Sequence, residues 1–157
     1  MAYNIVDIID RVMCICEKRL KVYLDIKRNQ IENTTMKLVT NVFINQEKNK
    51  IKYYEKFKSE IVIRELREID FHIYDKISSL MTQFNYRINC TDISSVDKIV
   101  HCSLEMDKDI LALFIDIRGR LVVKKEDSES LEYEILTNII EKQEKYIKDL
   151  EKMIRIK

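Results

Sequence analysis

The sequence predicts an all-helical protein built from a few long helices. Its 157 residues include one glycine and no proline, and these two residue types mark most turns, hairpins and bulges. Sandwiches and barrels need many such corners, and phosphate-binding loops of the Walker or Rossmann kind need several glycines close together. With 46% hydrophobic and 35% charged residues, the chain can bury a core and keep a solvated surface. Its length suits a single domain over residues 1–157.

The first helix is expected over residues 4–28. Apolar residues recur there at intervals of three and four, beginning with Ile5, Ile9 and Val12, which is the spacing of an amphipathic helix. A polar break over residues 29–33 follows and separates this helix from the next.

The second helix is expected over residues 34–60, with Met36 and Phe43 on its apolar stripe. Asn33 or Thr34 can cap it, because either side chain can accept a hydrogen bond from the first free N–H groups. The pattern then loosens over residues 61–93, which can form a shorter helix or an extended crossover.

The third helix is expected over residues 94–119. Ser94, with Asp97 three residues later, resembles a capping box, and Gly119 is the expected end of the helix.

The fourth helix is expected over residues 128–155. It follows the most polar stretch of the chain, and Asp127 or Ser128 can cap it. Two short connections and one long one favour a four-helix bundle with a crossover between helices two and three.

Each apolar stripe is interrupted near its middle by polar residues. Buried ionised groups are unfavourable unless they are paired or bound to metal, although any one of them can instead reach water from the edge of a stripe. Four helices with polar residues at the same level predict one shared polar layer. Its expected members are Cys16, Glu47, Lys50, Asp107, Gln143 and Tyr146, with Arg19 as a further candidate.

From about Val12 to Met153 the chain resembles the rubrerythrin branch of the ferritin-like superfamily. The stretch SSVDKIVHCSLEMDKDILALFIDIR resembles the family's third helix, with Asp107 at the position of a ligand carboxylate and Phe114 at that of an aromatic residue. The stretch CEKRLKVY resembles the first helix and puts Cys16 at the carboxylate position.

Two further stretches resemble the family's two E-x-x-H helices. In FINQEKNKIKYYEKF, Glu47 matches the motif and Lys50 stands where His is expected. In IIEKQEKYIKDLEKM, Gln143 replaces the Glu and Tyr146 replaces the His. The family holds two irons through four carboxylates and two imidazoles, so the departures fall on the ligands.

The resemblance implies a ferritin-like bundle without a rubredoxin-like domain and with a degenerate di-iron site. We expect no metal and no other cofactor. Lys50, with Arg19 as a second candidate, is expected to replace the metal charge. Together with Glu47 and Asp107 the two cations would form a formally neutral layer, hydrogen-bonded to Gln143 and Tyr146.

Three functions remain open at this level, and no catalytic residue is assigned. The preferred one is a non-catalytic structural or binding module. The second is a divergent di-iron peroxidase or oxidoreductase, with iron as its cofactor, a separate electron donor, and Glu17 and Glu144 as extra ligands beside Glu47 and Asp107. The third is a spore-coat or storage assembly protein of the same superfamily.

Charge and cysteine content set the expectations for partners and compartment. Lys and Arg number 28 against 27 Asp and Glu, without the basic excess of a nucleic-acid-binding protein. No apolar run approaches the roughly 20 residues of a membrane span, and no secretion signal is apparent. We therefore expect a cytoplasmic protein with its four cysteines reduced and mostly buried. Its expected partner is a second copy of the chain, in a homodimer. No C-x-x-C pair is present for a zinc ribbon.

Overall fold

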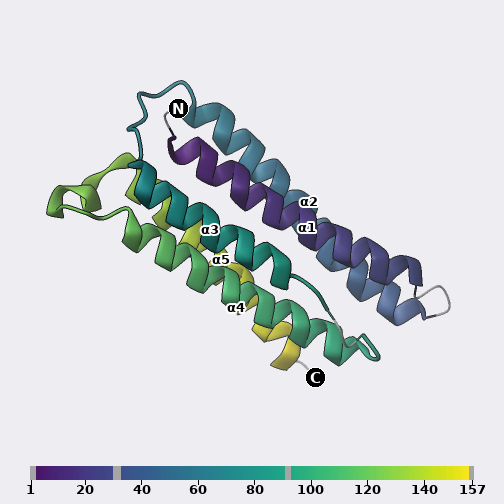
Figure 1. The fold of residues 1–157 in the computed structure, drawn as a ribbon. Helices are drawn as coiled ribbons and strands as arrows, with labels where there is room; N and C mark the ends of the chain where they lie inside the picture. Colours follow the sequence, from purple (N-terminus) through teal and green to yellow (C-terminus); the bar gives the residue numbers. More distant parts are fainter. Residues whose placement is uncertain (1–2, 30–32, 91–92, 156–157) are drawn as a thin grey trace.

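The computed structural model of the chain describes residues 3–29, 33–90 and 93–155, and it is all-helical (Figure 1). The elements are α1 (Ile5–Asn29), α2 (Thr34–Ile61), α3 (Phe71–Arg87), α4 (Val96–Arg120), the 3₁₀ turn η1 (Lys125–Glu129) and α5 (Leu131–Arg155). Within these ranges, extended pairing is limited to one bridge between Tyr3 and Ile69. The predicted all-α class is confirmed.

The four long helices begin and end within three residues of the predicted positions. Of the two alternatives for the crossover, the helical one is observed, since α3 occupies its central part. Residues 30–32 of the predicted polar break and residues 91–92 of the crossover lie outside the described part of the chain. None of the helices that the structure describes combines the length and the hydropathy that a membrane span requires.

Side-chain caps explain where two helices start. Asn33 Oδ1 accepts a hydrogen bond from the backbone N–H of Met36 at 3.0 Å, so Asn33 caps α2. The cap of α4 is Ser95 rather than Ser94, because its Oγ accepts from the N–H of Lys98 at 3.2 Å.

The predicted start of the last helix was wrong by one short turn. Asp127 accepts hydrogen bonds from the backbone N–H groups of Val123 and Lys124, so it organises the turn that precedes α5. The first turn of α5 is held by Ser130, whose Oγ accepts from the N–H of Tyr133 at 3.2 Å.

Gly119 does not terminate α4. The helix continues through it to Arg120, and no residue in the described ranges has a positive φ. A Cβ at Gly119 would meet no atom within 4 Å, so neither conformation nor space requires glycine there.

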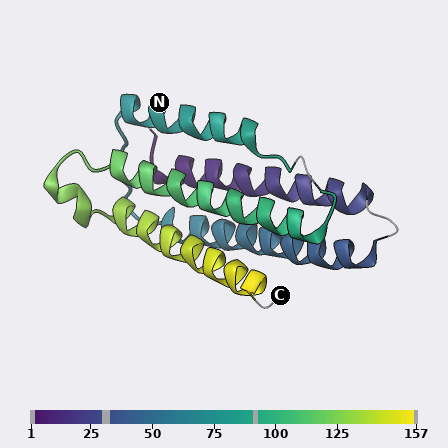
Figure 2. The same ribbon diagram turned by 90° about the horizontal axis from the view of Figure 1, so that it is seen from below.

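The helices form two side-by-side pairs, α1 with α2 and α4 with α5 (Figures 1 and 2). The two pairs approach each other between α2 and α4, and α3 lies against α1 and α4. The interior between the pairs is therefore filled by side chains from all four long helices.

The cysteines differ from the expectation of four reduced, mostly buried thiols. Cys90, which follows α3, and Cys102 on α4 form a disulfide. Cys14 is exposed and Cys16 is buried, because residues two apart on a helix point about 200° from each other. Disulfides persist mainly in oxidising compartments, so the cysteines do not support the predicted cytoplasmic location.

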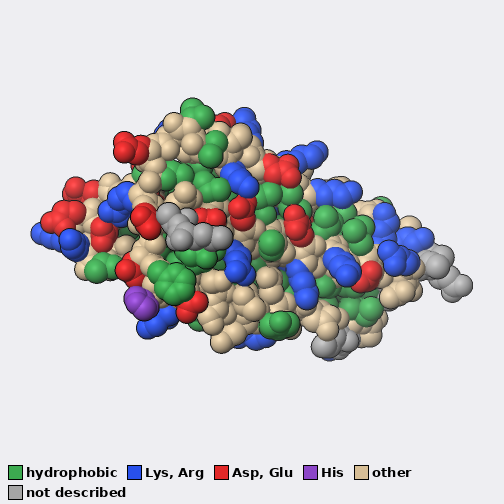
Figure 3. Space-filling view, turned by 45° about the horizontal axis from the view of Figure 1, so that its top comes forward, with side chains coloured by type: hydrophobic (Ala, Val, Ile, Leu, Met, Phe, Trp, Pro, Cys, Tyr) green, Lys and Arg blue, Asp and Glu red, His purple; other side chains and the backbone are tan. Residues whose placement is uncertain are grey.

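The surface carries charges of both signs. On the face shown in Figure 3, Lys and Arg side chains are interspersed with Asp and Glu, and hydrophobic side chains lie between them. On this face, positive and negative side chains are thus mixed locally and do not form one basic patch and one acidic patch.

Candidate functional site

The polar residues at the middle of the four long helices converge inside the bundle. Arg19 comes from α1, Glu47 and Lys50 from α2, and Asp107 from α4. These four side chains are 1–3% exposed, so their charges are removed from bulk water. We call Arg19, Glu47, Lys50 and Asp107 the charge cluster.

Each cation of the charge cluster lies within ion-pair distance of each anion. Arg19 Nη1 is 2.5 Å from Asp107 Oδ1 and 3.1 Å from Glu47 Oε1. Lys50 Nζ is 3.3 Å from Glu47 Oε1 and 3.5 Å from Asp107 Oδ1. Two positive and two negative charges therefore compensate one another in a low-dielectric interior.

Neutral hydrogen-bonding groups extend the charge cluster on both sides. Gln143 on α5 donates through Nε2 to the backbone oxygen of Asp107 at 2.9 Å and to its Oδ1 at 3.3 Å. Arg19 Nη2 donates to the Tyr23 hydroxyl at 2.9 Å, which is 2.7 Å from Ser103 Oγ. All four long helices thus contribute to one polar network.

Tyr146 contacts the network in a way the sequence did not suggest. We expected Tyr146 to be hydrogen-bonded to the layer, whereas the Lys50 ammonium lies over its ring at 4.5 Å from the centroid. This is a cation–π contact. Tyr146 lies on α5 and is half-buried.

Cys16 lies beside the charge cluster as an uncharged thiol. Burial and the neighbouring Glu47 carboxylate raise its pKa to about 12. The thiolate, the reactive form of cysteine, is therefore suppressed at neutral pH. Glu17 and Glu144, the extra ligands of the enzyme hypothesis, are exposed.

The ionised states of Arg19, Lys50 and Asp107 are stabilised by the neighbouring charges of the cluster. Burial opposes the charge of Arg19 and of Lys50, but Asp107 and Glu47 outweigh it and raise the pKa of both cations. Burial likewise opposes the charge of Asp107, but Arg19 and Lys50 outweigh it and hold the pKa of this carboxyl below its usual value. These three groups stay charged across the neutral range.

Two atoms of the cluster lack a hydrogen-bond partner among the described residues, namely Nε of Arg19 and Oε2 of Glu47. A buried polar atom without a partner is unfavourable by roughly 1–3 kcal/mol. Since the ions also lose hydration, we expect the cluster to contribute more to the specificity of helix pairing than to net stability.

The residues present do not fit a two-iron centre. Such a centre uses four carboxylates and two imidazoles, whereas the charge cluster offers Glu47 and Asp107, each already paired with Arg19 and Lys50. Within the described ranges, no three His, Cys, Asp or Glu side chains are grouped so that they could hold a metal ion.

One buried acid escaped the sequence analysis. Glu132 is 3% exposed and forms an ion pair with Arg67, with 3.3 Å between Oε2 and Nε. The signal was present, because Glu132 lies four residues before Leu136 on the apolar stripe of α5. Ser103 likewise lies on the stripe of α4, four residues before Asp107.

Comparison with known proteins gives no relative. No protein-family model, no curated protein and no solved structure matches the chain.

Proposed function

We propose that the chain is a ferritin-like bundle in which a charge cluster stands in place of a di-iron centre, and that it acts as a non-catalytic structural or binding module. The observation that carries this proposal is that both cations of the cluster pair with both carboxylates. Arg19 and Lys50 thereby supply the positive charge that metal ions would otherwise provide. The order of the helices, with α3 between the two pairs, is compatible with the ferritin-like arrangement.

The protonation chemistry of the network favours a non-catalytic role. A general acid or base works best when its pKa lies near the operating pH. In the network, the pKa values of Arg19 and Lys50 are raised, that of Asp107 is lowered, and that of Cys16 is about 12. None of these four groups is poised to exchange a proton or to act as a nucleophile at neutral pH.

Metal analysis tests the proposal. We expect protein purified from iron-supplemented cells to contain less than about 0.1 iron per chain, because each carboxylate is already paired. Ferrous iron added to the purified protein should leave its melting temperature unchanged. Iron near two per chain, with the absorption of an oxo bridge, would overturn the proposal and favour the divergent peroxidase.

A matched variant tests whether the cations replace metal charge. In the double variant Arg19→Met with Lys50→Met, Glu47 and Asp107 lose their partners, and two buried carboxylates are the ligand type that divalent metals bind. We expect Mn²⁺ to raise the melting temperature of this variant and not that of the wild type. If the double variant does not fold, Lys50→Met alone serves, and an equal response of variant and wild type would contradict the replacement.

The predicted homodimer stays a prediction. Apolar side chains such as Leu38, Val42 and Met153 are 62%, 49% and 43% exposed on α2 and α5, and a second copy would remove them from water. Light scattering after size-exclusion chromatography measures the oligomeric state, and a mass of one chain would contradict the dimer.

A further inference from the structure

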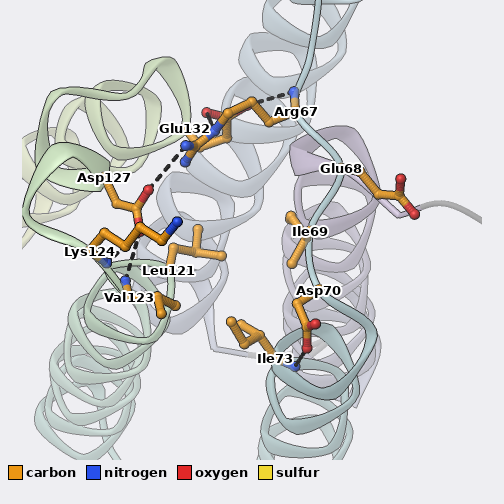
Figure 4. Close-up of a pocket in the computed structure, with 10 residues that line it drawn as sticks. All are labelled: Arg67, Glu68, Ile69, Asp70, Ile73, Leu121, Val123, Lys124, Asp127 and Glu132. Carbon is orange, nitrogen blue, oxygen red and sulfur yellow. Dashed lines mark hydrogen bonds and ion pairs between the residues drawn. The ribbon is translucent and has the colours of Figure 1, made fainter.

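A cavity of about 360 Å³ lies at the end of the bundle where the connection before α3 meets the connection between α4 and α5 (Figure 4). This volume falls in the range of small-molecule sites. The cavity lies outside the charge cluster and shares no residue with it.

The two connections are held together by a paired set of charges. Arg67 Nη1 lies 3.0 Å from Asp127 Oδ1, and Arg67 Nε lies 3.3 Å from Glu132 Oε2. The backbone N–H of Arg67 also donates to Glu132 Oε1 at 3.1 Å. Two residues further on, the N–H of Ile69 donates to the backbone oxygen of Tyr3 at 2.7 Å. The wall of the cavity is thus fixed from three parts of the chain.

The inner surface of the cavity combines apolar side chains with two further charged residues, Lys124 and Asp70. Ile69, Ile73 and Leu121 supply apolar surface, and Val123, 69% exposed, stands at the rim. Lys124 lines the cavity from the connection between α4 and α5. Its ammonium forms no ion pair with any residue that the structure describes.

Asp70 lines the cavity from the opposite side, at the start of α3 (Figure 4). Its Oδ1 accepts from the N–H groups of His72 and Ile73, which leaves Oδ2 without a partner in the described ranges. Glu68 points away from the cavity (Figure 4). One unpaired cation and one carboxylate oxygen therefore remain for a ligand, on opposite sides of an apolar surface.

We propose that this cavity binds a small zwitterion with an apolar side chain, of the α-amino acid class. Its carboxylate pairs with Lys124, its ammonium pairs with Asp70, and its side chain contacts Ile69, Ile73 and Leu121. A purely anionic ligand is disfavoured, because Arg67 is already paired with both Asp127 and Glu132. These three side chains together carry one excess negative charge. A purely cationic ligand leaves Lys124 unpaired.

Binding of three matched probes to the wild-type protein tests the proposal. L-leucine carries both charges, 4-methylpentanoate has the same skeleton without the ammonium, and 3-methylbutylamine has it without the carboxylate. A hydrogen bond to a charged group is worth enough for about a tenfold change in affinity. We expect saturable chemical-shift changes at backbone amides of residues 67–73 and 121–127 with leucine, and about tenfold weaker binding of the other two probes.

Two substitutions assign each charge. Lys124→Gln should weaken leucine about tenfold and leave 3-methylbutylamine unaffected, because that probe has no carboxylate. Asp70→Asn keeps the α3 cap, since Asn caps as well as Asp, and should weaken leucine while leaving 4-methylpentanoate unaffected. Lys125→Gln, on the neighbouring exposed residue that does not line the cavity, is the matched control.

Three results would overturn the assignment. The first is no saturable shift with leucine, and the second is an acid or amine probe that binds as tightly as leucine. The third is an equal effect of Lys124→Gln and Lys125→Gln. The probe series on the wild type decides the matter even where a variant fails to fold.

Discussion

Arg19 on α1 lies 2.5 Å from Asp107 on α4 and thereby joins the first helix pair to the second. The same guanidinium reaches Glu47 on α2 at 3.1 Å. One side chain therefore compensates a carboxylate in each pair, at the level where the two pairs meet. Substitution can separate two effects of this arrangement. Removal of one charge tests how much the remaining charges depend on their partners, and removal of all four tests whether the cluster adds net stability.

Removal of Arg19 alone should destabilise the protein strongly. Arg19→Met leaves Asp107 and Glu47 with Lys50 as their one cation, and breaking a buried pair by removing one partner is unfavourable by about 3–5 kcal/mol. Urea denaturation measures the loss in the free energy of unfolding. Arg28→Met is the control on the same helix, because its ion pair with Asp25 is exposed and contributes at most about 1 kcal/mol. Equal losses in the two variants would contradict a central role for Arg19.

Removal of all four charges should restore most of the lost stability. The variant with Arg19→Met, Glu47→Leu, Lys50→Met and Asp107→Leu replaces the cluster by apolar side chains. Replacing a whole buried ion cluster is often neutral or stabilising by about 1–4 kcal/mol. We therefore expect an unfolding free energy near that of the wild type, measured in the same denaturation series. A loss equal to the sum of the single substitutions would show that the cluster is itself a net source of stability.

Stability should fall at both ends of the pH scale for opposite reasons. The pKa of Asp107 is lowered on folding, so its contribution is present above the unfolded value of about 3.9 and is lost as the pH falls through the folded value. The pKa of Lys50 is raised, so its contribution is present below about 10.4 and is lost as the pH rises through the folded value.

Denaturation midpoints at intervals between pH 3 and pH 11 measure this profile. The half-buried Asp127, whose pKa is lowered to about 2, also weakens the fold in acid, so the informative quantity is the difference between wild type and Asp107→Asn. We expect the variant to lose less stability than the wild type below about pH 4. Parallel acid limbs would mean that Asp107 is not the residue responsible.

The sequence was sufficient to predict which segments are helical, but it did not predict the residues at which the helices begin. Apolar residues at intervals of three and four, with no proline, leave the middle of each long helix one possible structure. Starts and ends depend on competing caps a few residues apart. Here Ser95 caps α4 in place of the predicted Ser94, and Ser130 caps α5 in place of the predicted Asp127 or Ser128. Local spacing does not decide between such neighbours, because the choice depends on where the connection leads the chain.

The buried polar network could be predicted from the sequence for the same reason as the helices, namely the regular spacing of the apolar residues. A polar residue on an apolar stripe has to meet a partner, so the mid-helix positions of Glu47 and Asp107 already indicated a buried cluster. The role of Tyr146 could not be predicted from the sequence. A tyrosine at this position can contact Lys50 through its ring or form a hydrogen bond through its hydroxyl, and the sequence does not distinguish the two. The disulfide was also missed, because Cys90 and Cys102 are brought together by the path of the crossover rather than by a spacing motif.

Substitution of the single glycine should stabilise the protein. Gly119 is helical, and a Cβ there meets nothing within 4 Å, so Gly119→Ala gains helix propensity and restricts the unfolded chain. The expected gain in the free energy of unfolding is about 0.5–1 kcal/mol. Ala112→Gly, at an exposed position of the same helix, is the reverse control and should lose a similar amount. A loss of stability in Gly119→Ala would indicate that the end of α4 is more constrained than its geometry implies.

The four cysteines should react in three distinct steps. In the native protein, one thiol per chain should react with a colorimetric disulfide reagent, because Cys14 is exposed and Cys16 is buried with its pKa raised to about 12. Unfolding without reductant should expose Cys16 as the second thiol, and reduction should then release Cys90 and Cys102. Cys14→Ser should abolish the native reaction and leave the later steps unchanged. Three reactive thiols in the native protein would contradict the disulfide, whereas rapid reaction of two thiols in the native state would contradict the burial of Cys16 beside Glu47.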